Sequence, residues 1–235
     1  MQVLCLLSAL FRKSGTGLDV LKMKHRQDLV KAVAEEQKQR EREALMRGLL
    51  EQPMMNTNLN RDRIQEFGLP ERWWPVLIAV PPSVLTNWEQ EIDKWTNLSF
   101  AVYSDPNTRE KAISQITSGM AEVMLIKNSC FTVKERFREL CAIPVRWKLI
   151  IFDEFHTFKN KDATAVANIR ELKNLNHCLV VGMSGTVMQN NHQELWNLVD
   201  LVETNFLGDW NEFKYEVADP IKLGRYAVLH FCYQL

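Results

Sequence analysis

From residue 73 onward, the chain alternates between short apolar runs and segments whose apolar residues recur at helical spacing. The run WPVLIAVP (74–81) is apolar throughout and ends at two prolines, which is typical of a strand buried on both faces. The next segment, 83–95, has the spacing of an amphipathic helix, and Ser83 stands where its N-cap is expected. The same reasoning predicts strands at 98–104, 121–127, 147–154 and 178–185, and helices at 107–118, 133–140, 164–172 and 192–202.

Apolar strands that alternate with helices predict an α/β fold with a mostly parallel sheet. In such sheets, ligands bind beyond the carboxyl ends of the strands. The polar residues of this region follow the strands at those ends, so one edge of the sheet is expected to carry the functional site. They are Pro82-Ser83, Lys127-Asn128, Asp153-Glu154 and Ser184-Gly185-Thr186.

The first part of the chain has a different pattern. Residues 2–11 favour a short buried helix that SGTG (14–17) ends; a signal peptide would have a basic residue before the apolar run and small residues at a cleavage site. Residues 18–52 favour a charged helix, and EEQKQRERE (35–43) is polar all round. This segment is therefore a solvated helix projecting from the body or a partly disordered insertion, and 56–63 is a loop or a short polar helix start. No apolar run approaches the length of a membrane span.

Composition narrows the class of protein only modestly. The 235 residues are 46% hydrophobic and 25% charged, which is ordinary for a soluble globular protein. The formal net charge is zero, so no global basic field indicates nucleic-acid binding, although a local patch would suffice. The five cysteines are scattered, and none forms a C-x-x-C pair, which favours a reducing compartment, the cytosol or the nucleus.

Two carboxylates, Asp153 and Glu154, end the apolar run WKLIIFDE. Buried carboxylates are costly to desolvate unless a positive group meets them. One can hold magnesium while the other orients or deprotonates a water, which is the Walker-B role in nucleotide hydrolysis. The alternative is an N-cap after a strand. His156 is equally open to a structural role, and no second histidine stands at metal-ligand spacing, so a zinc site is not expected.

The string SGTVMQNNHQELW opens with a small, hydroxyl-bearing turn, Ser184-Gly185-Thr186. At the end of a strand, such a turn can hydrogen-bond both to the acidic pair and to a phosphate or a nucleic-acid backbone. Gln189 and Asn190 add donors and acceptors without charge. The alternative is a strand-to-helix loop rich in capping residues.

Three longer strings contain these residues in order: PVLIAVPPSVLTNWEQEIDKW, WKLIIFDEFHTFKN and VGMSGTVMQNNHQELWNLVDLV. In these strings the chain resembles the first RecA-like lobe of the Swi/Snf-type, helicase-like DNA-dependent ATPases of superfamily two. The family patterns are P-x-L-I-V-x-P-x-S-L-x-x-N-W-x-x-E-x-x-K-W, D-E-x-H-x-x-K-N, which is a DEAH-like box, and L-T-G-T-P-x-Q-N-N-x-x-E-L-W. Residues 206–225 also resemble the family segment after the third motif, and Thr186-Val187-Met188 favours the excision-repair, Cockayne-syndrome-B-like branch.

The resemblance implies a division of the chain and a role for each motif residue. Residues 1–12 correspond to the helix that follows the phosphate loop, 13–72 to a charged helical insertion, and 73–235 to the core of the ATP-binding lobe. It implies that Asp153 coordinates magnesium, that Glu154 positions the attacking water, and that His156 links the nucleotide site to a coupling motif. The coupling motif is Ser184, Gly185, Thr186, Gln189 and Asn190, and the implied DNA contacts are Ser83, Asn87, Lys127 and Asn128.

The chain departs from the family pattern in several places. Phe155 stands where the family has alanine, Ser184 where it has threonine and Val187 where it has proline. Lys127-Asn128-Ser129 replaces a threonine-and-tyrosine stretch. The sequence contains no phosphate-loop string G-x-x-x-x-G-K-[ST], and SGTG at 14–17 does not substitute for it.

The resemblance implies part of an ATP- and magnesium-dependent translocase on double-stranded DNA. Its parent would remodel chromatin or other DNA-bound protein in the nucleus, with a role in transcription or DNA repair, and would contain a second RecA-like lobe. Without a phosphate loop and the arginine fingers of that second lobe, this chain is expected to be an inactive fragment on its own. The alternatives are a non-enzymatic DNA- or protein-docking module and, less in keeping with the motifs, a DEAD/DEAH-type RNA helicase.

Overall fold

A parallel β-sheet forms the centre of the molecule. The computed structural model describes residues 2–13, 15–46, 74–160, 163–186 and 191–222. In this described part, the sheet has five strands, all paired in parallel, in the order β2-β3-β1-β4-β5. The predicted α/β fold is therefore confirmed. The strands are β1 (Val76–Val80), β2 (Phe100–Tyr103), β3 (Val123–Lys127), β4 (Leu149–Phe152) and β5 (Leu179–Gly182).

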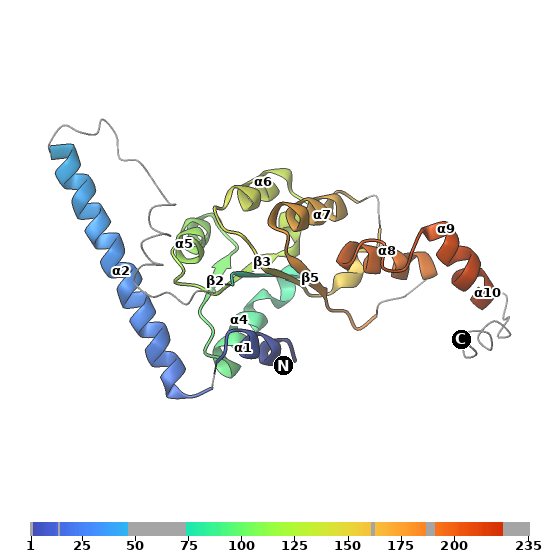
Figure 1. Ribbon diagram of the computed structural model, residues 1–235, viewed down its shortest axis with the longest axis horizontal. Helices are drawn as coiled ribbons and strands as arrows, with labels where there is room; N and C mark the ends of the chain where they lie inside the picture. Colours follow the sequence, from blue (N-terminus) through green and yellow to red (C-terminus); the bar gives the residue numbers. More distant parts are fainter. Residues whose placement is uncertain (1, 14, 47–73, 161–162, 187–190, 223–235) are drawn as a thin grey trace.

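Helices cover both faces of the sheet (Figure 1). One face carries α5 (Pro106–Thr117), α6 (Lys134–Ala142) and α7 (Thr164–Asn176), and the other carries α1 (Gln2–Leu10) and α4 (Leu85–Trp95). Successive strand residues point to opposite faces, so Leu77 belongs to one core cluster and Ile78 to the other. Burial on both faces explains why the strands are apolar without alternation.

The first turn of α4 differs from the sequence prediction. Residues Pro82–Val84 form a 3-10 turn, in which the N–H of Val84 donates to the carbonyl of Pro81 at 3.1 Å. The α-helix begins only at Leu85, and its N-cap, Val84, makes no side-chain cap bond. The prediction that Ser83 caps this helix is therefore wrong. The two prolines cannot donate backbone hydrogen bonds and set the tight turn, which leaves Ser83 inside it and exposed.

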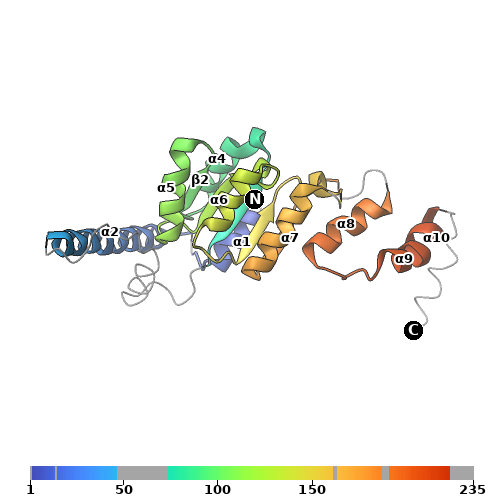
Figure 2. The ribbon, with the colours of Figure 1, turned by 90° about the horizontal axis from the view of Figure 1, so that it is seen from above.

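The helix α2 (Gly17–Met46) lies beside the body and extends away from it (Figure 2). Its thirty residues carry pairs of opposite charge one turn apart, such as Glu36 and Arg40. The predicted charged helix is confirmed up to Met46, and the remainder of 18–52 and the loop at 56–63 lie outside the described residues. Within the described part of the chain, no helix is both long and apolar enough to cross a membrane.

The C-terminal helices extend the body at the β5 side of the sheet (Figures 1 and 2). The first, α8 (His192–Val202), is tied to α7 by the ion pair of Arg170 with Asp200 at 2.7 Å. The short helices α9 (Trp210–Phe213) and α10 (Asp219–Lys222) follow it, with one π turn between them. Strand β5 is the edge of the described sheet next to this region, and Leu179 in it is 66% exposed.

Candidate functional site

The carboxyl ends of four neighbouring strands bring the predicted site residues to one edge of the sheet. Pairing places Val80 opposite Lys127, and Phe152 opposite both Ala79 and Gly182. The backbone ladder continues one step past β4, because Asp153 N–H donates to the Ala79 carbonyl at 2.9 Å. The acids therefore lie between the predicted DNA contacts, which follow β1 and β3, and the hydroxyl-bearing turn, which follows β5.

Asp153 is held by three hydrogen bonds from different parts of the chain. Its Oδ2 accepts from the indole Nε1–H of Trp88 at 2.9 Å, and its Oδ1 accepts from the backbone N–H of Glu154 at 2.9 Å. Its backbone carbonyl accepts from the side-chain amide Nδ2 of Asn128 at 3.3 Å. The carboxylate caps no α-helix, so the alternative of an N-cap is not what the structure shows. Each carboxylate oxygen keeps a second lone pair for a cation or a water.

Glu154 occupies a strained backbone position. Its φ is 51°, in the left-handed region, which costs on the order of 1 kcal/mol for a residue other than glycine. The turn sends its side chain to the surface, where it is 49% exposed, and its Oε2 lies 3.2 Å from Nδ1 of His156.

His156 bridges the turns that follow β4 and β5. Its Nδ1 lies 2.9 Å from Oγ of Ser184, and this Oγ lies 3.1 Å from both the carbonyl oxygen and the N–H of Thr186. The same Nδ1 lies 3.2 Å from Oε2 of Glu154, and because a carboxylate can only accept, a proton on Nδ1 satisfies both contacts. His156 thus contacts Glu154 on one side and Ser184 on the other, and it is this histidine that is hydrogen-bonded to the hydroxyl-bearing turn.

The other residues of the predicted coupling motif add little to the geometry of the site. Gly185 and Thr186 are exposed, and Gln189 and Asn190 lie outside the described residues. Asn191 caps α8, since its side-chain oxygen accepts from the N–H of Glu194 at 2.9 Å. The alternative of a loop with capping residues is correct for Asn191 and does not account for the bond between Ser184 and His156.

Phe155, which replaces alanine in the family pattern, is a core residue. It is 5% exposed, and its ring packs against Phe152 and Phe158 with centroid distances of 5.8 and 5.9 Å. It also lies over Gly182 at the end of β5. The sequence analysis did not identify Gly182 as its complement, although a glycine inside an apolar strand often marks a close approach.

The four predicted DNA contacts lie on the side of the acids away from β5. Ser83 and Asn87 are both exposed, Ser83 in the 3-10 turn before α4 and Asn87 in the first turn of α4. Lys127 is half-buried, with its Nζ 3.9 Å from Oδ1 of Asp105. Asn128 is half-buried as well, and its side-chain amide is turned to the backbone of Asp153, so it supports the acid.

Trp88 is the residue that sequence reasoning missed. Its place in the helical pattern of 83–95 accounts for packing alone. A partly buried indole also needs an acceptor for its N–H, and that requirement was the available signal. The sequence could not show that this acceptor is Asp153, because the two residues are 65 positions apart.

The residues present fit one side of a magnesium–nucleotide site. In the described ranges, no three histidine, cysteine, aspartate or glutamate side chains are grouped so that they could hold a metal. Magnesium in nucleotide sites commonly takes one or two carboxylates, with water and phosphate oxygens completing its shell. Asp153 fits that role, and an all-protein metal cage does not fit.

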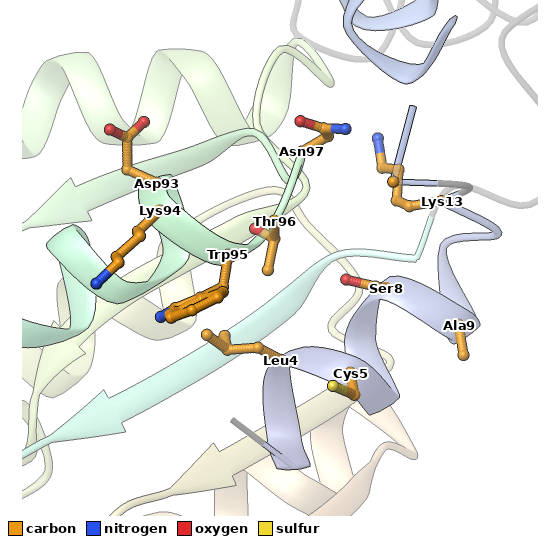
Figure 3. A pocket seen from close by; sticks show the side chains of 11 residues that line it. Leu4, Cys5, Ser8, Ala9, Lys13, Asp93, Lys94, Trp95, Thr96 and Asn97 are labelled. Atoms are coloured by element: carbon orange, nitrogen blue, oxygen red, sulfur yellow. The ribbon is translucent and has the colours of Figure 1, made fainter. Parts of the chain in front are cut away.

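A separate hollow lies at the opposite end of the sheet, between α1 and the end of α4 (Figure 3). Its volume is about 570 Å³, and Leu4 and Ser8 of α1 face Trp95 and Thr96 across it. Since α4 runs from the carboxyl edge of the sheet to the other edge, this hollow and Asp153 belong to opposite ends of the helix.

A parallel sheet with helices on both faces, an acidic pair after β4 and a hydroxyl-bearing turn after β5 define a RecA-like helicase lobe. Residues 1–232 match the family described as the SNF2-related domain, and the chain belongs to that family. The resemblance deduced from the motifs is confirmed at this level.

Curated relatives and a solved structure agree with the family. Switch 2 of Arabidopsis thaliana is 31% identical over 154 residues, which are 65% of this chain and 17% of that protein. The mouse DNA excision repair protein ERCC-6-like 2 is 31% identical over 63% of this chain and 9% of its own length. The TATA-binding protein-associated factor mot1 of Aspergillus fumigatus is 32% identical over 70% of this chain and 9% of its own length.

Among solved structures, the Sulfolobus solfataricus SWI2/SNF2 ATPase core in complex with dsDNA matches with a TM-score of 0.51 and 28% identity. The match covers 71% of this chain and 32% of that chain. The chain therefore spans only a small part of each of these proteins. The percentages of identical residues in the three curated relatives are too similar to select a branch of the family. The Cockayne-syndrome-B-like assignment therefore stays a prediction.

Proposed function

We propose that this chain is part of an ATP-dependent translocase that moves on double-stranded DNA and remodels chromatin or other DNA-bound protein. The parent protein would act in the nucleus, in transcription or DNA repair. The observation that carries the proposal is the direct bridge from the acids through His156 to Ser184, with Ser83 and Asn87 exposed on the other side of the acids. Family membership and the printed names of the relatives support it.

In this proposal, each residue has a defined task. Asp153 holds magnesium, directly or through water, with the carboxylate fixed by the bonds described above. A bound magnesium–ATP would supply a phosphoryl group whose negative charge the cation offsets. Glu154 orients the attacking water from its exposed position, and His156 transmits the position of the acids to Ser184.

DNA contact is proposed for Ser83, Asn87 and Lys127. Contacts to phosphates are independent of sequence and weaken as salt rises. The second RecA-like lobe of the parent would close over the carboxyl edge of the sheet. Because the sequence has no phosphate-loop string, we propose that this chain alone has no appreciable ATPase activity.

The test combines DNA binding and ATP turnover. Fluorescence anisotropy with a short duplex of random sequence, measured at low and at physiological salt, should show binding that salt weakens, and Lys127→Glu should reduce it. Lys148→Glu is the matched control. It reverses a charge just before β4, at the amino ends of the strands and so away from the proposed DNA contacts. Steady-state ATPase assays should show no turnover with or without DNA. Turnover at a rate typical of complete enzymes would overturn the proposed inactivity.

The missing phosphate-loop string also favours a second candidate, a non-enzymatic module that docks on DNA or on a protein. A fusion that adds a phosphate-loop segment before residue 1 and a second RecA-like lobe after residue 235 separates the two. DNA-stimulated ATPase activity in the joined protein favours the translocase, and unchanged DNA binding without activity favours the docking module. Stronger binding to duplex RNA than to duplex DNA would support the RNA-helicase alternative.

A further inference from the structure

Asp153 is hydrogen-bonded directly to both elements that are proposed to contact DNA, through its carboxylate to α4 and through its backbone carbonyl to the turn after β3. We propose that Trp88 and Asn128 are positioning residues, which couple the position of DNA on α4 and on the turn after β3 to the position of Asp153. The inference rests on the proposed function for the DNA contact. It goes beyond that function because it names the path from DNA to the magnesium-binding carboxylate.

The first branch of the path runs through α4. Trp88 lies in the first turn of this helix, directly after the exposed Asn87, and its indole N–H donates to Oδ2 of Asp153 at 2.9 Å. An indole has a donor and no acceptor, and a bond from it to an ionised carboxylate is charge-assisted. A shift of the start of α4 therefore moves this donor relative to the carboxylate.

The second branch runs through the turn after β3. Asn128 directly follows Lys127, and its Nδ2 donates to the backbone carbonyl of Asp153 at 3.3 Å. Its Oδ1 is buried and has no hydrogen-bond partner among the described residues. Leaving a buried acceptor unpaired is unfavourable, so a rearrangement of this turn that supplies a donor is favoured. DNA bound at Lys127 can provide such a rearrangement.

These two branches hold different parts of the same residue. Trp88 holds the side chain and Asn128 holds the main chain, while the N–H of Glu154 holds the other carboxylate oxygen. A misplacement of about 1 Å at a reacting centre can change a rate about 100-fold. DNA that shifts α4 or the β3 turn thus changes how well Asp153 is aligned for a cation.

Indole signals in ¹⁵N-correlated NMR spectra of the full 235-residue chain test the coupling. Trp88→Phe keeps the aromatic ring and identifies the Trp88 signal by its loss. Trp95→Phe identifies the control, because Trp95 lies at the far end of the same helix and is 50% exposed. Asp153→Ala should shift the Trp88 signal and leave the Trp95 signal in place. An unchanged Trp88 signal would show that the hydrogen bond is absent and overturn the proposal.

Two further measurements test the path itself. Asn128→Ala should shift the Trp88 signal through Asp153, and a random-sequence DNA duplex at low salt should shift it in the native chain while the Trp95 signal stays in place. A duplex that binds by anisotropy without shifting the Trp88 signal overturns the coupling and leaves the proposed function standing. A duplex that does not bind at all overturns both. Equal shifts of the Trp88 and Trp95 signals indicate a general change in the helix and also overturn the coupling.

Discussion

The ring of Phe155 fills the space that a side chain on Gly182 would need. A Cβ on Gly182 would overlap with Cδ1 and Cγ of Phe155, far inside van der Waals contact. Phe155 follows the acids after β4, and Gly182 ends β5 just before the turn with Ser184. The pair therefore fixes the spacing between the two turns that His156 bridges.

This relationship predicts that substitutions at the two positions are coupled. Gly182→Ala should destabilise the protein because the ring must move, and Phe155→Ala should cost about 3–5 kcal/mol through the cavity it leaves. The double variant should be more stable than the sum of the single effects predicts, by about 0.5–3 kcal/mol. Urea unfolding of the four proteins measures this. Gly185→Ala is the control, because nothing lies within 4 Å of a Cβ there, and additive effects at 155 and 182 would contradict the prediction.

The bridge between His156 and Ser184 predicts a tautomer. Nδ1 of His156 should carry the proton in the neutral ring, since the Glu154 carboxylate 3.2 Å away can only accept and Ser184 Oγ at 2.9 Å can accept as well. Ser184→Ala leaves the Glu154 carboxylate as an acceptor and should keep the Nδ1–H form, whereas Ser184→Ala combined with Glu154→Ala should shift the imidazole toward the Nε2–H form. Long-range ¹H–¹⁵N spectra of the histidine ring distinguish these forms. A ring that is Nε2-protonated in the native chain would show that the donor assignment is wrong.

The buried carboxylate of Glu122 ties the end of α1 to the sheet, and we predict that its removal destabilises the protein. It is 5% exposed, and its oxygens accept from the N–H and Oγ of Ser99 at 3.0 Å and pair with Nζ of Lys13 at 2.9 Å. Glu122→Ala leaves these buried donors without their acceptor and should cost about 3–5 kcal/mol. Thermal or urea unfolding measures this, with the exposed Glu110→Ala as a control that should change stability by less than about 0.5 kcal/mol. Equal effects of the two variants would contradict the anchoring.

The cysteines predict a pattern of alkylation at pH 8. Cys5 is exposed and should react in the native chain, whereas Cys130 and Cys178 are buried and should be protected. Burial raises the pKa of the Cys178 thiol from its ordinary value of 9.0 to about 11, so it stays protonated at this pH. Mass spectrometry of the peptides after a short exposure to iodoacetamide measures each site. Rapid modification of Cys178 without unfolding would contradict its burial.

The same pKa shift sets the sign of a pH effect on stability. The folded state holds the Cys178 proton more tightly than the unfolded state, in which the thiol has its ordinary pKa. The contribution to stability is therefore complete below pH 9.0 and is lost as the pH rises toward about 11. Cys178→Ala should lessen the loss of stability over this window in urea unfolding, and Cys5→Ala should leave the window unchanged.

The strands were predictable because burial on both faces leaves an unbroken apolar run. The run at 74–81 became β1 (Val76–Val80), and the run at 147–154 became β4 (Leu149–Phe152). The predicted ends of these two strands are one or two residues too long, and the predicted strand 178–185 runs three residues past the end of β5, since polar contacts and turns take over where the ladder ends. The start of α4 was misplaced because the sequence signal for capping at Ser83 is weaker than the constraint of the prolines before it.

The site was predictable in its location and only partly in its contacts. Strand ends in a parallel sheet meet at one edge, so polar residues after 127, 152 and 182 had to lie near one another. The bond of Trp88 to Asp153 and the packing of Phe155 on Gly182 depend on how separate elements pack. Neither leaves a periodic signal along the chain, so a single sequence does not reveal them.

Strand β5 is the edge strand of the described sheet, and it also leads directly into the turn that contains Ser184. An edge strand offers unpaired backbone donors and acceptors as a template for a further strand, and the apolar Leu179 there is exposed. Concentrated solutions of this chain should therefore associate edge to edge, as light scattering would detect, and Leu179→Lys should suppress the association. A backbone segment that pairs with β5 would also restrain the turn at Ser184 that follows it. Association through this edge and the alignment of the candidate site would therefore depend on the same strand.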